Sequence, residues 1–404
     1  MNTLKLGVIK EGKNPPDKRV PLTPNQCVQL IKEYSNLNLT VQSSQVRIFK
    51  DEAYSNLNVP VVDSLEDRDV IIGVKEVNIE DLLPNKTYLF FSHTIKEQPY
   101  NRELLRAILD KNIRLLDWEV LTDPKRNRLI GFGRYAGIVG AYNGLIAYGK
   151  RTGKYDLKPA YQCEDRVEME AEFSKLALPA IKILLTGTGR VAHGAEETLN
   201  RAGIQKVTPE EYLEKSFDYP VYTRIGVEHY NKRKDGKPSG QSDFYKNSDQ
   251  YESDFMRWAK VSDMFIAGHF YAEGSPYLFT REDAKSSDFN IQVVADISCD
   301  IDGPVASTIK PSTIEDPIYG YNPQTESEDD FTKPDVITVM AVDNLPCELP
   351  KDASESFGEE FSTKILPAFF DGDQEGILDR ATMTLNGKLT ERFSYLQDYV
   401  DGKH

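Results

Sequence analysis

Short apolar runs alternate with amphipathic segments along the first third of the chain. The runs have the length and composition of strands, and the segments between them carry apolar residues at helical spacing. The predicted strands are 4–9, 39–42, 70–74, 88–91 and 114–117, and the predicted helices are 24–34 and 102–109. Because strands alternate with helices, we expect an α/β fold with a largely parallel sheet.

A second series of the same kind begins at residue 181. Its predicted strands are 181–185, 205–208, 264–267, 292–297 and 336–341, with a helix over 190–201. A Gly- and Ala-rich segment, 135–150, precedes the series and indicates a helix whose small residues allow close packing. The polar segment 212–251 is too long for an ordinary connection, so we expect either an insertion over a cleft or a mobile loop.

Two amphipathic segments, 350–370 and 385–400, follow the second series and predict helices. Since that series is complete at 336–341, we expect the tail to pack on the amino-terminal domain. The sequence therefore predicts two Rossmann-like domains with parallel sheets flanked by helices. The first is discontinuous, residues 1–137 plus 343–404, and the second covers 138–342.

The charge and the cysteines narrow the class of protein. The 404-residue chain carries 64 acidic and 49 basic residues, a formal net charge of −15, which repels nucleic acids and acidic membrane surfaces. No stretch approaches the roughly 18 apolar residues of a membrane span, and the first residues indicate a strand rather than a leader, so we expect a cytoplasmic protein. The four cysteines form no CxxC pair, which indicates neither a metal site nor a disulfide framework. The sequence leaves open whether the chain forms a homo-oligomer.

The clearest chemical signal is an apolar strand that runs directly into a GxGxxA turn and a helix. Gly187 permits the tight turn, Gly189 lets a pyrophosphate approach the backbone, and Ala192 lets the helix lie close to the strand. This context predicts a site for NAD or NADP rather than a plain glycine turn. The other residues of the turn are Thr188, Arg190 and Val191.

The preferred dinucleotide is not decided by the sequence. The acid that would hold the ribose 2′-hydroxyl of NAD is expected about 20 residues after the turn, at the tip of the next strand. That tip is Thr208. Glu210 and Glu211 lie close enough to substitute, whereas Lys206 or Arg190 would meet a 2′-phosphate of NADP.

Two basic residues follow predicted strands of the first domain. Lys75 follows 70–74 and His93 follows 88–91, and open α/β sheets bind ligands at the carboxyl ends of their strands. Two basic groups of different strength on one edge suit proton transfer in two directions. Alone, Lys75 would be a solvated strand end, His93 a structural histidine and Arg19 a surface residue. The other histidines are His193, His229, His269 and His404, of which His269 follows a strand end and is a candidate for the cofactor side.

A set of motifs, in order along the chain, resembles the alanine dehydrogenase and saccharopine dehydrogenase superfamily. The motifs are RVPLTP (19–24), IIGVKE (71–76), FFSHTIKEQ (90–98), LLDWE (115–119), GFGRYAGIVGA (131–141), GTGRVAHGA (187–195) and VDNLPCELPKDASE (342–355). The resemblance is strongest to the lysine-forming saccharopine dehydrogenases and to the lysine-ketoglutarate reductase half of the animal bifunctional enzyme.

The resemblance implies an active-site cleft between a substrate domain and a Rossmann domain. It implies Lys75 and His93 as acid–base groups, with Glu76 and Glu119 as charges that tune them. It also implies a set of substrate-side residues and one residue near the nicotinamide. These are Arg19, Lys96, Gln98, Glu119 and Arg128 on the substrate side, and Asp343 near the nicotinamide.

The expected reaction is hydride transfer between NAD(P)(H) and the imine of lysine and 2-oxoglutarate, which gives saccharopine. The lysine ε-amine, with a pKa near ~10.4, must lose a proton before it attacks the 2-oxo carbon, so a base is needed. Lys75 or His93 can be that base, and for Lys75 the pKa must fall through burial or a nearby cation. The alternatives are an alanine dehydrogenase acting on pyruvate and ammonia, or a catalytically silent nucleotide-binding protein. Retention of Lys75, His93 and Arg19 together argues against a silent protein.

Overall fold

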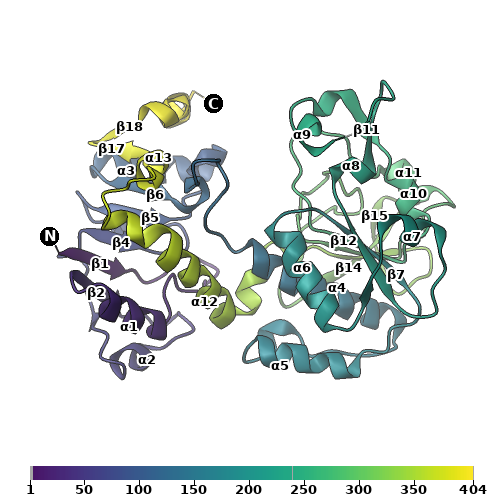
Figure 1. Cartoon of the computed structure of the whole chain (residues 1–404), viewed down its shortest axis with the longest axis horizontal. Helices are drawn as coiled ribbons and strands as arrows, with labels where there is room; N and C mark the ends of the chain where they lie inside the picture. Colours follow the sequence, from purple (N-terminus) through teal and green to yellow (C-terminus); the bar gives the residue numbers. More distant parts are fainter. Residues whose placement is uncertain (1–2, 239, 404) are drawn as a thin grey trace. The chain divides into compact units, whose positions relative to one another are not determined.

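The computed structural model describes residues 3–238 and 240–403, and the chain divides into two compact units (Figure 1). Unit 1 comprises Met1–Phe132 with Pro350–His404, and unit 2 comprises Gly133–Leu349. The first unit is therefore discontinuous, as predicted. The predicted boundary at 137/138 falls inside helix α4 (Gly133–Thr152).

Unit 1 contains one parallel sheet with the strand order β3-β2-β1-β4-β5-β6. The strands are β1 (Leu4–Val8), β2 (Leu37–Gln42), β3 (Val61–Val62), β4 (Val70–Ile72), β5 (Thr87–Phe90) and β6 (Arg114–Asp117). The order reverses between β1 and β4, so the carboxyl ends of these two strands flank the crevice where doubly wound sheets bind ligands. The two-residue strand β3 was not predicted because it is too short to show a period.

Helices cover both faces of this sheet, and the last three of them belong to the tail. They are α1 (Pro24–Glu33), α2 (Asp51–Ser55), α3 (Arg102–Asp110), α12 (Pro350–Glu360), α13 (Ile377–Ala381) and α14 (Gln397–Asp401). The 3₁₀ turns are η1 (Ile79–Asp81), η2 (Thr94–Lys96), η3 (Pro99–Asn101), η4 (Trp118–Val120), η10 (Leu366–Phe369) and η11 (Glu391–Leu396), and η9 (Phe361–Ile365) is a π-helical turn. Helix α1 begins at a capping box of Thr23 and Gln26 with Pro24 at its first position, which explains why its start was predictable.

The tail packs on unit 1, as predicted. Trp118 makes edge contacts with Phe357 and Phe361 of the tail, at centroid distances of 5.2 Å and 5.8 Å. The prediction of a helix over 385–400 was wrong in its first part, where the strands β17 (Thr384–Leu385) and β18 (Lys388–Leu389) form a hairpin. Its two turn residues, Asn386 and Gly387, have φ values of 51° and 71°, the left-handed pair that a tight hairpin requires.

Unit 2 contains a mixed sheet with the strand order β15-β14-β16-β13-β12-β7-β9-β8. The strands are β7 (Lys182–Thr186), β8 (Gln205–Lys206), β9 (Val221–Ile225), β12 (Met264–Ala267), β13 (Val293–Asp296), β14 (Ile318–Asn322), β15 (Ser327–Asp329) and β16 (Ile337–Met340). Strand β14 runs antiparallel to β15 and β16, so the prediction of a parallel sheet was wrong at this edge. Strand β15 lies within the acidic run 325–330.

The helices of unit 2 are mostly short. They are α4, α5 (Arg166–Ala171), α6 (Arg190–Arg201), α7 (Pro209–Glu214), α8 (Val227–Tyr230), α9 (Gln241–Phe244), α10 (Met256–Ala259) and α11 (Arg281–Lys285), with the 3₁₀ turns η5 (Ala160–Gln162), η6 (Glu172–Lys175), η7 (Ser248–Gln250) and η8 (Leu345–Glu348). The longest helices, α4 and α6, touch through their backbones. A Cβ atom on Gly137 would lie 1.9 Å from the carbonyl oxygen of Val191, and one on Gly194 would lie 1.9 Å from that of Arg134. The small residues of 135–150 therefore serve close packing, as predicted.

The polar segment 212–251 is a folded insertion that contains a central strand. Strand β9 pairs with β7 on one side and with β8 on the other, so the predicted second strand of the series lies at the edge of the sheet. After β9 come α8, the strand β10 (Asn231–Arg233), α9 and the strand β11 (Tyr251–Ser253), which pairs antiparallel with β10. Residue 239 lies outside the described part of the chain.

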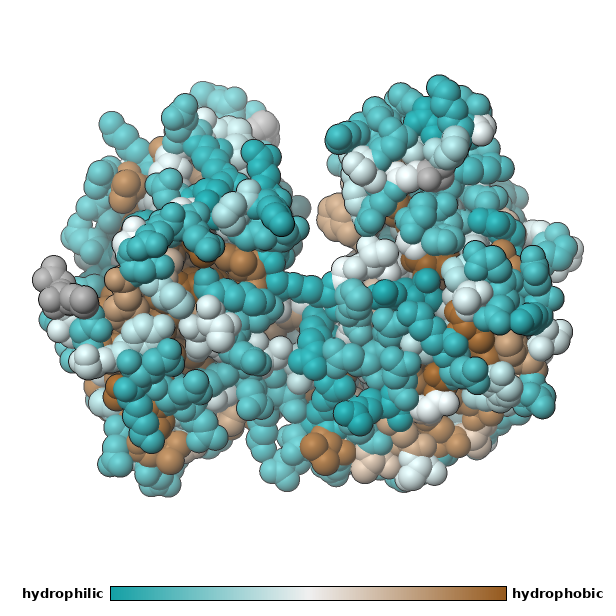
Figure 2. All heavy atoms as spheres, viewed as in Figure 1, coloured by the Kyte–Doolittle hydropathy of each residue, from teal (hydrophilic) through white to brown (hydrophobic). Residues whose placement is uncertain are grey.

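On the face shown in Figure 2, each unit is mainly hydrophilic, with apolar side chains scattered among polar ones. In residues 3–238 and 240–403, no helix combines the length and the apolar character that crossing a bilayer demands.

Candidate active site

The carboxyl edge of the unit 1 sheet gathers the predicted catalytic residues. Glu11 follows β1, Lys75 and Glu76 follow β4, His93 follows β5 and Glu119 follows β6. Because β1 and β4 flank the point where the strand order reverses, Glu11 and Lys75 follow the two strand ends at which doubly wound sheets generally bind ligands.

Glu11 fixes the backbone that carries Lys75. Its two carboxylate oxygens accept hydrogen bonds from the amides of Val74 and Lys75, at 2.7 Å and 2.9 Å. Burial raises the pKa of Glu11 to about 8, although these two amides oppose the rise. Sequence reasoning missed this residue, whose only signal was an acidic side chain shortly after the first strand.

The half-buried ammonium group of Lys75 lies in a cationic environment. Burial lowers the pKa of Lys75, and the charges of Arg19 and Lys13 lower it further, while Asp17 and Glu76 act in the opposite direction. A lowered pKa gives Lys75 a larger neutral fraction near pH 7, which base chemistry needs.

His93 is held by a hydrogen bond with Glu76. Its Nδ1 lies 2.6 Å from Oε1 of Glu76, whose Oε2 accepts a hydrogen bond from Lys13 at 2.9 Å. Burial would raise the pKa of Glu76, but the bonds from His93 and Lys13 lower it to about 2. Since a carboxylate only accepts, Nδ1 of His93 carries the hydrogen, and Nε2 is the nitrogen that can exchange a proton with a substrate.

Asp117 ties together the loops that follow β5 and β6. Its carboxylate accepts hydrogen bonds from the Ser92 amide (2.8 Å), the Ser92 hydroxyl (2.5 Å) and the Glu119 amide (2.7 Å). His93, the next residue after Ser92, has a φ of 54°, a left-handed conformation that costs energy outside glycine. The bonds to Asp117 stabilise this strained position of the imidazole.

Arg19 is a buried residue rather than the surface residue that it would be on sequence grounds alone. Its side chain is 4% exposed and its Nε and Nη2 donate to the carboxylate of Asp17, at 3.0 Å and 2.5 Å. The Arg19 guanidinium lies 4.1 Å from the centroid of the Phe132 ring. Burial opposes ionisation of Asp17, yet Arg19 lowers the pKa of Asp17 to about 2, so the pair is ionic.

The other predicted substrate-side residues lie on the loops after β5 and β6. Lys96 Nζ is 3.6 Å from Oε1 of Glu119, whose buried Oε2 has no hydrogen-bond partner in the described part of the chain. Arg128 lies over the Phe91 ring at 5.4 Å, and Phe91 stacks on His93 at 6.2 Å. Gln98 is exposed, and its carbonyl oxygen accepts a hydrogen bond from Tyr399 of the tail at 2.6 Å.

A cavity of about 390 Å³ opens beside the Glu76–Lys13 pair. Its lining also includes Asn14, Tyr100 and Asn101, and the buried Nδ2 of Asn101 has no hydrogen-bond partner in the described residues. Glu76 and the polar side chains of this lining are therefore next to a space that a ligand can enter.

The glycine-rich turn of unit 2 leaves room for a ligand where the pattern predicts one. Gly187 has a φ of 110°, and a Cβ atom there would lie 2.4 Å from the carbonyl oxygen of Gly268. A Cβ atom on Gly189 would meet nothing within 4 Å. Helix α6 begins directly after Gly189 with no side-chain cap, so its first amides point at this open space and suit a pyrophosphate.

His269 follows β12, the strand next to β7, and lies near the same turn. Its Nδ1 is 2.8 Å from the Thr186 hydroxyl, while its buried Nε2 has no hydrogen-bond partner in the described residues. Burial lowers the pKa of His269 to about 4, so the ring is neutral at pH 7. Asp343 is exposed, three residues after the end of β16. These polar groups, with the open turn, fit a dinucleotide.

Thr208 does not lie beside the glycine-rich turn, contrary to its predicted place in the cofactor site. It follows β8 at the edge of the sheet, and β9 lies between β8 and β7. The Thr208 hydroxyl accepts from the Glu211 amide at 3.2 Å, and the Glu211 carboxylate accepts from the Thr208 amide at 3.3 Å. Both side chains therefore serve as the cap of α7.

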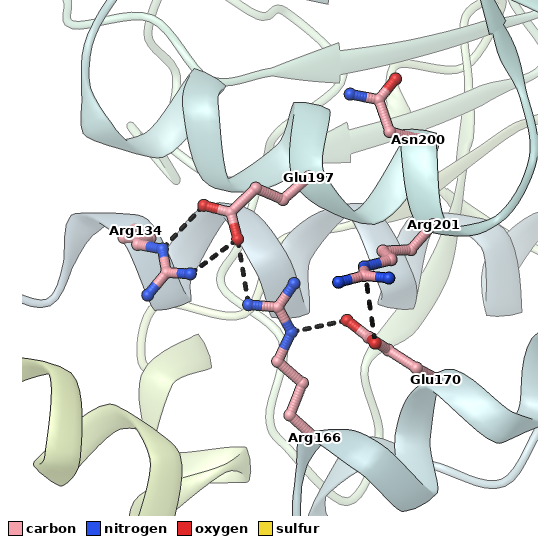
Figure 3. Close-up of a pocket in the computed structure, with 6 residues that line it drawn as sticks. All are labelled: Arg134, Arg166, Glu170, Glu197, Asn200 and Arg201. Carbon is pink, nitrogen blue, oxygen red and sulfur yellow. Dashed lines mark hydrogen bonds and ion pairs between the residues drawn. The ribbon is translucent and has the colours of Figure 1, made fainter.

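A recess of about 500 Å³ between α4, α5 and α6 is filled with ion pairs (Figure 3). Glu197 accepts from Arg134 at 2.7 Å and from Arg166 at 3.0 Å, and Arg166 also donates to Glu170 at 2.6 Å. These groups neutralise one another, so we interpret the recess as a link between helices rather than a ligand site.

Comparison with known proteins finds one matching domain model and several relatives of moderate identity. Residues 7–139 match the model of the alanine dehydrogenase/PNT N-terminal domain. The chain is 28% identical to the mitochondrial alpha-aminoadipic semialdehyde synthase of Mus musculus, over 97% of this chain and 47% of that protein. It is 26% identical to the NAD(+), L-lysine-forming saccharopine dehydrogenase of Schizosaccharomyces pombe, over 92% of this chain and 95% of that protein. The chain is therefore similar over most of its length to aminoadipic semialdehyde synthases and saccharopine dehydrogenases, and residues 7–139 match a domain of the alanine dehydrogenase/PNT type.

Two solved structures share the fold. An L-alanine dehydrogenase matches with a TM-score of 0.66 and 16% identity, over 98% of this chain and 100% of that chain. A transhydrogenase from Sinorhizobium meliloti matches with a TM-score of 0.54 and 14% identity, over 96% and 99%. The chain spans less than half the length of the aminoadipic semialdehyde synthases, 41% for that of Arabidopsis thaliana and 47% for that of the mouse.

Proposed function

We propose that the chain is a saccharopine dehydrogenase of the lysine-forming type, which joins lysine to 2-oxoglutarate or runs the reverse oxidation of saccharopine. The observation that carries the proposal is the pairing of a lysine with lowered pKa, Lys75, and an imidazole held by a carboxylate, His93, at the ligand edge of one sheet. The similarity to saccharopine dehydrogenases and aminoadipic semialdehyde synthases supports the choice of substrates.

Lys75 and His93 would divide two proton movements. One removes a proton from the ε-ammonium group of the substrate lysine, and the other gives a proton to the hydroxyl of the carbinolamine so that water leaves. The pairing of Nδ1 with Glu76 directs Nε2 of His93 to one of these tasks, and the cations near Lys75 keep that amine available for the other. The dinucleotide supplies hydride to the resulting imine when it is bound.

Cations, together with a carboxylate oxygen that has no hydrogen-bond partner in the described residues, support a substrate with several charges. Saccharopine has three carboxylates and two amino groups, whereas alanine has one of each. Lys96 and Arg128 would hold carboxylates, and the buried Oε2 of Glu119 would accept a hydrogen bond from an ammonium group. Arg19 is already paired with Asp17, so we assign it a shared role in which Asp17 and a substrate carboxylate both contact the guanidinium.

The glycine-rich turn would hold the dinucleotide. The amides at the start of α6 suit the pyrophosphate, and the free Nε2 of His269 supplies a neutral polar group beside it. An alanine dehydrogenase is the second candidate, because residues 7–139 match the alanine dehydrogenase/PNT N-terminal domain.

An assay of substrate pairs tests the proposal. We expect lysine with 2-oxoglutarate to drive oxidation of NADH or NADPH far faster than ammonia with pyruvate. Faster turnover with ammonia and pyruvate would replace the proposal by the alanine dehydrogenase function, and no turnover with either pair would leave a silent nucleotide-binding protein. Lys75→Met provides the inactive control.

A further inference from the structure

The cavity of about 390 Å³ in unit 1 lies on the side of His93 that does not face the reaction. Glu76 lines this cavity and holds Nδ1 of His93 at 2.6 Å. Nε2, the nitrogen assigned to the substrate, is on the other side of the imidazole ring. In the described part of the chain, none of the residues predicted on the substrate side lines the cavity. Its volume is within the range of small-molecule sites, roughly 300 to 1,000 Å³.

Three separate segments of unit 1 contribute to the lining. The loop after β1 provides Lys13, the η1 turn provides Glu80, and the residue just before α3 is Asn101. The first two segments are packed tightly, because Nδ2 of Asn78 would lie 2.4 Å from a Cβ atom on Gly12. The same Nδ2 donates to the Gly12 carbonyl oxygen at 3.4 Å. The walls are therefore fixed by contacts that involve neither Lys13 nor Asn101.

Two hydrogen-bond donors of the lining suit a carboxylate. Asn101 is 5% exposed, and its buried Nδ2 has no hydrogen-bond partner in residues 3–238 and 240–403. Its side chain makes no capping hydrogen bond to α3, so the helix does not use this amide. A buried donor without an acceptor is costly, which is typical of an atom that a bound ligand satisfies. The ammonium group of Lys13 has three N–H donors, of which Glu76 accepts one at 2.9 Å.

The rest of the lining suits an ammonium group and an apolar body. Glu80 is exposed, and its carboxylate has no ion-pair partner among the described residues. Val77 and Leu104 are buried apolar residues of the same lining. The charged residues of the lining are two glutamates and one lysine, so a ligand that carries only negative charge is disfavoured. A ligand with both charges satisfies all of these groups.

We propose that this cavity is an effector site that binds a small aliphatic α-amino acid as its zwitterion. The carboxylate of the ligand contacts Lys13 and Asn101. Its ammonium group contacts Glu80, and its side chain packs on Val77 and Leu104. An inorganic anion lacks the ammonium group and an alkylamine lacks the carboxylate, so each of them makes only part of these contacts.

Lys13 connects the site to the proposed chemistry. Burial lowers the pKa of Lys75, and the charges of Arg19 and Lys13 lower it further. Asp17 and Glu76 act in the opposite direction. A ligand carboxylate beside Lys13 offsets its positive charge, so the pKa of Lys75 rises when the ligand binds. The limb of the kcat/KM profile that Lys75 governs then moves to higher pH. This step rests on the proposed function, whereas binding of the ligand does not.

Titration calorimetry with the full chain tests the site. L-valine is added to the chain saturated with saccharopine, which occupies the substrate site and cannot react without a dinucleotide. We expect L-valine to bind under these conditions. Two analogues, 3-methylbutanoate without the ammonium group and 2-methylpropylamine without the carboxylate, should bind roughly tenfold or more weakly, the scale of one lost hydrogen bond to a charged group.

Substitutions in the lining locate the bound amino acid. We expect Glu80→Gln and Asn101→Asp each to weaken L-valine binding by roughly tenfold or more. Glu66→Gln and Asn56→Asp make the same chemical changes at exposed positions of unit 1 outside the lining, and both should bind as the wild type does. Because Glu80 is exposed, Glu80→Gln should keep the wild-type melting temperature and remains decisive if Asn101→Asp does not fold.

Several results overturn the proposal. They are no binding of L-valine, displacement of L-valine by saccharopine, equally tight binding of 3-methylbutanoate, and wild-type affinity in Glu80→Gln with a normal melting temperature. In steady-state assays L-valine should move the pH profile of the wild type and not that of Glu80→Gln, and an unmoved wild-type profile would mean that the cavity is not an effector site.

The proposed function fails separately. A chain that binds L-valine as described but does not join lysine to 2-oxoglutarate retains the amino-acid site and lacks the function. A chain that joins them but does not bind L-valine lacks only the effector site. If saccharopine does not bind, the same titration without it shows whether the cavity takes the amino acid.

Discussion

Nδ1 of His93 lies 2.6 Å from Oε1 of Glu76, and this contact leaves Nε2 as the imidazole nitrogen that can exchange a proton with a substrate. Glu76 also accepts from Lys13, so the carboxylate stays ionised, and its lowered pKa of about 2 reflects both partners. Lys13 follows β1, Glu76 follows β4 and His93 follows β5, and these three strands are neighbours in the sheet. Sheet order, rather than sequence proximity, therefore builds the site.

Replacing either proposed acid–base group should lower turnover and spare dinucleotide binding. We expect Lys75→Met and His93→Gln each to reduce kcat by roughly 10² to 10⁴-fold, the range for losing a general acid or base. The affinity for NADH should change little, because neither residue lies in the dinucleotide-binding unit. Steady-state kinetics with lysine and 2-oxoglutarate, together with NADH titration, checks this. A near-normal kcat in either variant would mean that the replaced residue is not an acid–base group and has a structural role.

Removing the positive charge of Lys13 should move the pH profile. Lys13 is one of the cations that lower the pKa of Lys75, so Lys13→Met should let that pKa rise. Whether Lys75 acts as base or as acid, the limb of the kcat/KM profile that it governs then moves to higher pH. Lys10→Met removes an exposed lysine of the same loop and serves as the control. A shift to lower pH, or an equal shift in both variants, would contradict the assignment.

Loss of a substrate-side cation should weaken binding of the dicarboxylate. We expect Lys96→Ala and Arg128→Ala to raise the KM for 2-oxoglutarate or saccharopine by roughly tenfold or more, with the KM for NADH little changed. Lys125→Ala removes an exposed lysine near Arg128 and should leave all three constants alone. An increase confined to the KM for NADH would place Lys96 or Arg128 outside the substrate site.

A buried carboxyl of unit 2 should make stability depend on pH. Burial raises the pKa of Glu348 to about 8, although Asn143 donates to it at 2.7 Å. The folded state thus keeps a proton that the unfolded state loses above its usual pKa of 4.5. The associated stability is present at low pH and declines as the pH rises toward about 8, by at most about 1.4 kcal/mol per pH unit.

Glu348→Gln tests this dependence because the amide stays neutral. Chemical unfolding between about pH 5 and pH 8 should show a smaller loss of unfolding free energy in the variant than in the wild type. Glu273→Gln, at an exposed position of unit 2, should follow the wild type. Identical pH dependence in Glu348→Gln and the wild type would mean that Glu348 is ionised in the folded state.

The regular parts of both units were predictable because their signals are local. The strands 114–117 and 264–267 and the helix 190–201 have the predicted bounds, since each is an apolar or amphipathic run with clear ends. The hairpin at Asn386 and Gly387 was missed because flanking apolar residues also fit a helical period. Strand β9 was missed because its polar neighbours hid a run of only five residues.

The site was predictable where function depends on strand ends and unpredictable where it depends on sheet order. Lys75 and His93 follow apolar strands, so their positions could be read from the sequence. The partners Glu11 and Asp117 act across strands, and nothing in a single sequence reports which strand neighbours which. For the same reason Thr208 was placed at the ribose, whereas the strand beside β7 is β9 and not β8.

Product identity tests the central claim most directly. The full chain is incubated with lysine labelled with ¹⁵N at the ε-amine, 2-oxoglutarate and NADH, and the products are analysed by mass spectrometry. The proposed function predicts one new compound that contains the whole lysine skeleton, the ¹⁵N atom as a secondary amine and the carbon skeleton of 2-oxoglutarate, formed in equal amount to the NADH oxidised. Oxidation of NADH without this compound, or appearance of the label in glutamate or ammonia instead, would contradict the assignment of saccharopine as the product.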